Sequence, residues 1–129
     1  MSFDWTKFLD VAEQLIPDKE ENPDDALLRT SISRSYYGAY GVAYTFFEQE
    51  GGVRPTENTH ISIHSIFKES QNDLVCEIGN GLGSLWIERK KADYKKESIW
   101  SLNQVKLLLI KARMIVSNVK EAKRNNLSL

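Results

Sequence analysis

The chain has 129 residues, of which 41% are hydrophobic and 27% charged, and its net charge is −1. This length and composition are typical of a single globular domain, here residues 1–129, that buries its core without disulfides or metal ions. The one cysteine, Cys76, excludes an internal disulfide and a cysteine-rich zinc site. There is no signal-peptide pattern and no apolar run of membrane-spanning length, so we expect a cytoplasmic protein that makes no membrane contact.

The charges are distributed unevenly along the chain. Residues 1–25 carry eight acids and two bases, whereas residues 86–129 carry eleven bases and four acids. Such asymmetry can indicate nucleic-acid binding. The alternative is that solvated helix faces of opposite sign pair with each other on folding. Charge alone favours this alternative without excluding nucleic acid.

The first predicted helix runs from Asp4 to Ile16. Asp4 is a residue type that caps helices, and Pro17 stops the helix because it has no backbone N–H to donate. The apolar face is expected to consist of Phe8, Val11, Ala12, Leu15 and Ile16. An acidic connection, residues 18–25, follows this helix.

A long second helix is predicted from about Asp24 to Glu50, and Gly51–Gly52 ends it. At about 38 Å it is expected to be the central spine of a bundle. Its apolar stripe has small residues at the centre, which lets another helix approach closely; the stripe comprises Leu28, Ile32, Ser35, Ala39, Val42 and Phe46. The helix also carries Arg29, Arg34 and four tyrosines, whose polar tips need partners: Tyr36, Tyr37, Tyr40 and Tyr44. We expect these tyrosines to be mostly core residues with hydrogen-bonded hydroxyls.

A short third helix is predicted from Thr59, its expected cap, to about Glu69. His60 and His64 are four residues apart on it and therefore share a face. A histidine pair at this spacing can hold a metal ion. Because no carboxylate or cysteine nearby completes a site, we predict no metal and interpret the histidines as a surface or interface pair.

The fourth predicted helix runs from Asp73 to about Asp93. Gly79, Gly81 and Gly83 each cost roughly 1 kcal/mol in a helix interior, so we expect a kink or close backbone packing there. A basic segment, residues 89–96, leads to a last helix that begins after Ser98 or Ser101. The tail, residues 125–129, is expected to fray.

No alternating strand pattern occurs in the sequence. The predicted fold class is therefore all-α, an antiparallel up-and-down bundle of about five helices.

Three motifs in order add a family resemblance to this reading. They are SRSYYGA from Ser33, Thr59-His60, and ERKKADY from Glu88 to Tyr94. Together they resemble the HEPN family of helical-bundle domains, over about residues 25–115. The resemblance implies a homodimer with a cleft at the dimer axis where each subunit presents an arginine. It also implies a place among toxins paired with a nucleotidyltransferase antitoxin, or among defence systems.

Active HEPN domains cut RNA without metal or cofactor through an R-x4-6-H motif, in which the histidine acts on the ribose hydroxyl and the arginine steadies the phosphate. Here Arg89 matches the arginine, but Tyr94 stands where the histidine would be. A phenol with a pKa near 10 is a poor base at neutral pH. Arg54 and His60 also fit R-x5-H by letter. We interpret that match as chance, because Arg54 precedes Pro55 in a predicted loop.

The resemblance therefore predicts a homodimeric domain that binds RNA or a nucleotide through a degenerate R-x4-Y motif. Arg89, Tyr94 and His60 are the candidate catalytic residues. Asp93 and Tyr37 are expected to support Arg89, and the expected nucleic-acid contacts are Arg34, Lys90, Lys91, Lys95 and Lys96.

Three alternatives stay open at this stage. Arg89 and Asp93, four apart on one helix, can form an ion pair that is purely structural and locks the fourth helix to Arg34 or Tyr37. The chain could also be an active metal-independent endoribonuclease toxin in which His60 or His64 replaces the missing histidine. Finally, its acidic first helix and basic last helix could serve protein–protein interaction alone.

Overall fold

The computed structural model describes residues 3–18 and 23–129, which form five helices and contain no strand. The helices are α1 (Thr6–Leu15), α2 (Asp25–Gln49), α3 (Thr59–Lys68), α4 (Asp73–Tyr94) and α5 (Leu102–Arg124). The predicted all-α bundle is confirmed. Of the predicted acidic connection, residues 19–22 lie outside the described part of the chain. None of these five helices is both long enough and apolar enough to cross a membrane.

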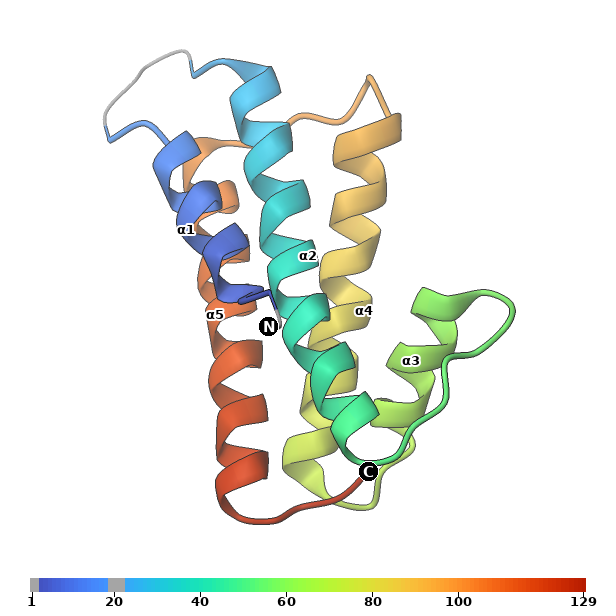
Figure 1. Cartoon of the computed structure of the whole chain (residues 1–129). Helices are drawn as coiled ribbons and strands as arrows, with labels where there is room; N and C mark the ends of the chain where they lie inside the picture. The colour runs from blue at the N-terminus through green and yellow to red at the C-terminus, as the bar shows by residue number, and fades with distance from the viewer. Residues whose placement is uncertain (1–2, 19–22) are drawn as a thin grey trace.

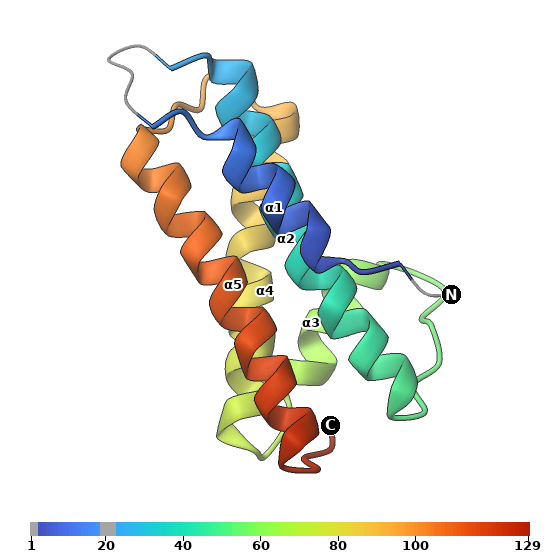
Figure 2. The same cartoon turned by 60° about the vertical axis from the view of Figure 1, so that its left-hand side comes forward.

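The long helices run up and down around α2 (Figure 1). α2 packs against α1, α4 and α5, and α4 and α5 also pack against each other. The short α3 lies beside the first half of α4, so the second half of α4 extends beyond it (Figure 1). α1 lies across α2 and α5 on the other side of the bundle, as Figure 2 shows. This arrangement makes α2 the central helix, as the sequence predicted.

The core of α2 follows the predicted stripe, because Leu28, Ile32, Ala39 and Phe46 are buried. α1 differs from the prediction. Leu9 and Ala12 are its buried residues, whereas Val11 is exposed. Val11 lies two positions beyond Leu9 and therefore points to the opposite side of the helix.

The helix ends are mostly those that the sequence predicts. Asp4 accepts a hydrogen bond from the Thr6 backbone N–H, and Ser101 forms a reciprocal capping box with Gln104. At the end of α2 the Gly51 N–H donates to the Glu48 carbonyl and the Gly52 N–H to the Phe47 carbonyl, with Gly51 at φ +85°.

Thr59 was wrongly predicted to cap α3. The chain enters this helix through Asn58 in the left-handed conformation, so Thr59 is already the first helical residue. Its hydroxyl turns back to the Pro55 carbonyl.

The prediction of a frayed tail was also wrong. Asn126 adopts φ 54°, and the Leu127 N–H donates to the Ala122 carbonyl, which closes a Schellman motif. This turn directs the chain back, and Leu127 and Leu129 pack against the core.

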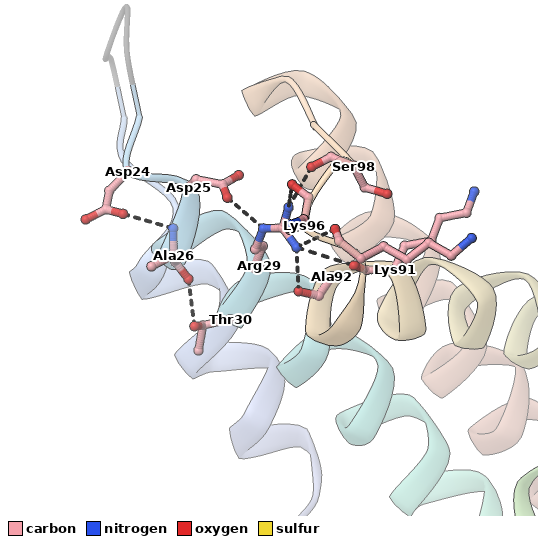
Figure 3. A network of polar contacts seen from close by, with 10 residues as sticks. Asp24, Asp25, Ala26, Arg29, Thr30, Lys91, Ala92, Lys96 and Ser98 are labelled. Atoms are coloured by element: carbon pink, nitrogen blue, oxygen red, sulfur yellow. Dashed lines mark hydrogen bonds and ion pairs between the residues drawn. The ribbon is translucent and has the colours of Figure 1, made fainter.

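Arg29 finds its partners at the end of α4 (Figure 3). Its guanidinium donates to five carbonyl oxygens, with N···O distances of 2.7 to 3.4 Å: those of Lys91, Ala92, Lys95, Lys96 and Ser98. It also pairs with Asp25 at 2.6 Å and lies 5.3 Å from the Trp100 ring. The last carbonyls of a helix lack intrahelical donors. Arg29 of α2 therefore caps α4 and fixes the turn toward α5.

The glycines of α4 allow close packing and cause no break. α4 is helical from Asp73 to Tyr94, and a Cβ added at Gly79 would lie 2.5 Å from the Lys68 backbone nitrogen and 2.8 Å from the His64 carbonyl oxygen. Gly79 thus permits α3 to lie directly on α4, which positions the two histidines of α3 against the spine.

Candidate functional site

The buried hydroxyl of Tyr36 joins the two histidines of α3. Its oxygen lies 2.7 Å from His60 Nδ1 and 2.9 Å from His64 Nε2. A tyrosine hydroxyl has one proton, so it donates to one ring and accepts an N–H from the other. The tautomers of His60 and His64 are therefore coupled through Tyr36.

His64 is 3% exposed, which corrects the prediction of a surface pair. The spacing of four residues directs both rings to the same side, and that side faces the Tyr36 hydroxyl. Burial, with smaller contributions from His60 and Lys68, lowers the pKa of His64 to about 4. Burial, followed by the positive charges of Arg89 and Arg54, lowers the pKa of His60 as well. Both rings are thus neutral at pH 7.

Two guanidinium groups face the ring of Tyr37. Arg89 Cζ lies 4.9 Å and Arg34 Cζ 5.2 Å from its centroid. The His60 ring packs edge-on against the same tyrosine, at 6.0 Å. Residues from α2, α3 and α4 therefore converge on Tyr37.

The Arg89 guanidinium is only partly satisfied. Its Nε lies 2.8 Å from Asp93 Oδ2 as an ion pair, yet this nitrogen is buried and has no hydrogen-bond partner within the described residues. Asp93 also accepts a 3.4 Å hydrogen bond from Ser33. Within residues 3–18 and 23–129, the one hydrogen bond of the Arg34 guanidinium is a 3.5 Å bond to Ser33 Oγ. The Arg89–Asp93 ion pair proposed as structural is present, yet the guanidinium makes no hydrogen bond in the described part of the chain.

Tyr94 lies at the margin of this arrangement. Its side chain is 76% exposed, and its ring centroid is 5.7 Å from Arg89 Cζ. α4 stays helical as far as Tyr94, so the phenol does not turn toward Tyr37. His60 is the titratable ring that shares Tyr37 with Arg89.

A cavity of about 520 Å³ opens beside His60. Its walls are mainly aromatic and come from α1, α2 and the start of α3: Trp5, Tyr37, Tyr40, Tyr44 and His60, with Gly41, Thr45, Glu48, Arg54 and Thr59. Tyr40 stacks on His60 with a centroid distance of 4.4 Å, and burial raises the pKa of Tyr40 to about 12. Of the spine tyrosines, only Tyr36 is a fully buried core residue. Tyr37, Tyr40 and Tyr44 are half-buried and line the cavity.

Arg54 lines the same cavity as His60. From the sequence, the match of Arg54 and His60 to R-x5-H is interpreted as chance, because Arg54 lies in a loop. The loop returns toward the start of α3, which brings the Arg54 charge close enough to affect the pKa of both His60 and Tyr40.

The predicted lysines divide into two groups. Lys90 Nζ lies 3.7 Å from the centroid of Trp86, which packs edge-on against His64, so Lys90 is next to the site. Lys91 pairs with Glu88 at 3.7 Å and lines a separate cavity of about 430 Å³ with Trp100. Lys95 and Lys96 are exposed near Arg29, beyond the end of α4.

Sequence reasoning found Arg34, Tyr37, His60, Arg89 and Asp93, and the structure brings them together. It missed Glu48 and the joining role of Tyr36. A signal for Tyr36 was present, since a buried tyrosine hydroxyl needs a partner and His60 and His64 are the polar rings of the adjoining helix. No group of three His, Cys, Asp or Glu side chains suited to a metal occurs in residues 3–18 and 23–129. No family model, curated protein or solved structure matches this chain.

Proposed function

We propose that this protein binds single-stranded RNA, with a phosphate at Arg34 and Arg89 and a base in the adjoining aromatic cavity. The observation that carries the proposal is the pair of guanidinium groups on Tyr37, of which that of Arg89 makes no hydrogen bond within the described residues. Guanidinium edges bind phosphate oxygens through paired, charge-assisted hydrogen bonds.

The local charge supports an anionic ligand. Arg89 pairs with Asp93, Arg34 has no ion pair in the part of the chain that the structure describes, and His60 and His64 are neutral at pH 7. Lys90 adds a cation at Trp86, whose ring packs on His64. The cavity next to this cluster has aromatic walls, and stacking on aromatic side chains is how proteins hold unpaired bases. A phosphate site beside a stacking site suits a single strand better than a duplex.

The HEPN resemblance is consistent with this proposal. Under it the chain is a cytoplasmic homodimer that works with a nucleotidyltransferase antitoxin or in a defence system. Each of these extensions requires its own test, beginning with the mass of the protein in solution.

A second candidate function is metal-independent RNA cleavage, which the geometry of His60 favours. Tyr36 holds the Nδ1 side of this ring, and the ring lines the cavity next to Arg54. A neutral imidazole beside two arginines can take a proton from a ribose hydroxyl while the guanidinium groups stabilise the phosphate.

The binding proposal is tested by fluorescence polarisation with a labelled mixed-sequence single-stranded RNA over a salt series. Arg34→Gln and Arg89→Gln remove one cation each. Arg113→Gln is the matched control, because Arg113 pairs with Asp10 and Glu13 on α1. We expect both site variants to weaken binding and to reduce the slope of log affinity against log salt by about 0.7 per lost phosphate contact. Equal binding by all three folded variants would overturn the proposal.

Cleavage is tested with the same RNA in EDTA. If the protein is a nuclease, His60→Ala and Arg89→Gln abolish cleavage while circular dichroism shows an intact helical fold. If the RNA stays intact although the protein is saturated with it, the protein binds this RNA but does not cleave it.

A further inference from the structure

We infer that the aromatic cavity beside His60 is a base-binding subsite that selects guanine. This inference rests on the proposed RNA-binding function and names the base that the same site takes. The carrying feature is the combination, at one cavity, of aromatic walls with one carboxylate, that of Glu48, and one guanidinium, that of Arg54.

The cavity depends on the missing side chain of Gly41. A Cβ at this position would lie 2.2 Å from Trp5 Cδ2, so only glycine lets the Trp5 indole lie against α2. Phe3 and Phe8 pack on the Trp5 ring at 5.0 and 5.6 Å and hold it there. Tyr44 stands next to Tyr40 at 6.0 Å on the α2 wall. The cavity is therefore lined by aromatic surfaces from α2 and from the residue just before α1, which suits a planar ligand.

The Glu48 carboxylate has no hydrogen bond or ion pair within the described residues. The five ion pairs there involve other acids, and no side-chain hydrogen bond reaches Glu48. A carboxylate accepts hydrogen bonds and donates none at neutral pH. Glu48 is an exposed residue of the cavity wall, so a ligand that offers donors there replaces water with direct hydrogen bonds to the carboxylate.

Among the four RNA bases, guanine alone presents two adjacent donors, N1–H and N2–H, on its Watson–Crick edge. Adenine and cytosine present one donor beside an acceptor, and uracil presents one donor between two carbonyl oxygens. Guanine also carries the acceptor pair O6 and N7 on the neighbouring edge, which is the preferred partner of an arginine fork. Glu48 and Arg54, which line one cavity, thus supply the acceptor and the donors that these two edges of guanine require.

The test is isothermal titration calorimetry with nucleoside monophosphates as probes: GMP, IMP, AMP, CMP and UMP. IMP lacks only the N2 amino group of guanine. We expect GMP to bind about tenfold more tightly than AMP, CMP or UMP, with IMP in between, because a bidentate pair discriminates by about this factor. Glu48→Gln should remove the preference, while Glu50→Gln, a neighbouring exposed acid on the same helix end, should leave it unchanged.

The outcomes separate this inference from the proposed function. RNA binding that depends on Arg34 and Arg89 without any preference for GMP would overturn guanine selection alone. A GMP preference that Glu48→Gln leaves intact would overturn the role of Glu48. Absence of both nucleotide and RNA binding would overturn the proposed function together with this inference. Guanosine, which has no phosphate, should keep its advantage over adenosine if the base contacts are those described.

Discussion

Replacement of Tyr36 by phenylalanine removes one oxygen atom from the centre of the site. That oxygen is the hydrogen-bond partner of both His60 Nδ1, at 2.7 Å, and His64 Nε2, at 2.9 Å. The ring of Tyr36 is fully buried and stays in place in the variant, so no large cavity forms. The change therefore measures the two hydrogen bonds and little else.

The expected loss follows from the burial of the two rings. Each hydrogen bond contributes about 1 kcal/mol, and a buried polar atom left without a partner costs about 1 to 3 kcal/mol. His64 is buried and cannot be rehydrated easily, whereas half-buried His60 can bind water. We expect the free energy of unfolding to fall by about 2 to 3 kcal/mol. With a slope of about 2 kcal/mol/M, the urea midpoint falls by about 1 to 1.5 M.

Urea unfolding followed by far-UV circular dichroism measures this loss. Tyr40→Phe is the matched control, because the Tyr40 hydroxyl forms no hydrogen bond within the described residues. The Tyr40 ring stacks on His60, and the phenylalanine ring keeps this contact. The control should change the midpoint by a few tenths of a molar unit at most. If Tyr36→Phe and Tyr40→Phe shift the midpoint equally, the histidine–tyrosine cluster does not stabilise the fold as argued.

Three further predictions concern the fold. Arg29→Lys keeps the charge but cannot reach five carbonyls, so unfolding free energy should fall by about 2 kcal/mol in urea titrations, with a larger loss for Arg29→Ala. The His64 pKa is about 4 against 6.5 when unfolded, so the folded chain binds fewer protons between these values. Stability should therefore decrease as pH falls from 6.5 to 4, by about 3 kcal/mol, and His64→Gln should flatten this dependence. Gly79→Ala should lower the melting temperature by several degrees, because the added Cβ meets the backbone of α3. Gly81→Ala should lower it less, because its Cβ meets only the Ile115 side chain. Equal shifts in the two variants would refute this contrast.

The helices could be predicted from the sequence because their signals are local. Each signal sets a helix boundary or a helix face within one turn of its own position. The signals are apolar periodicity, Pro17, the Gly51–Gly52 pair and Ser101. The errors arose where a distant contact decides. Leu9 is buried and Val11 exposed because of the way α1 lies on α2, and the tail folds back because Leu127 finds the core.

The site could be predicted only as a set of residues. Arg89, Asp93, Tyr37 and His60 were named from motifs, yet no spacing in the sequence shows that three helices bring them to one ring. The close packing of α3 on α4, which places His64 against Tyr36, depends on Gly79. In the sequence, a glycine at this position indicates only a lower helix propensity. Arg54 was set aside because its loop position gave no sign that the chain returns to α3.

The indole N–H resonances of the three tryptophans test the central claim most directly. Trp5 lines the aromatic cavity, Trp86 lies between His64 and Lys90, and Trp100 lies at the other end of α4, next to Arg29. In a titration of ¹⁵N-labelled protein with a short single-stranded RNA, the signals of Trp5 and Trp86 should move while that of Trp100 stays. Movement of Trp100 alone would place the RNA on Lys91, Lys95 and Lys96, and would contradict the site at Tyr37.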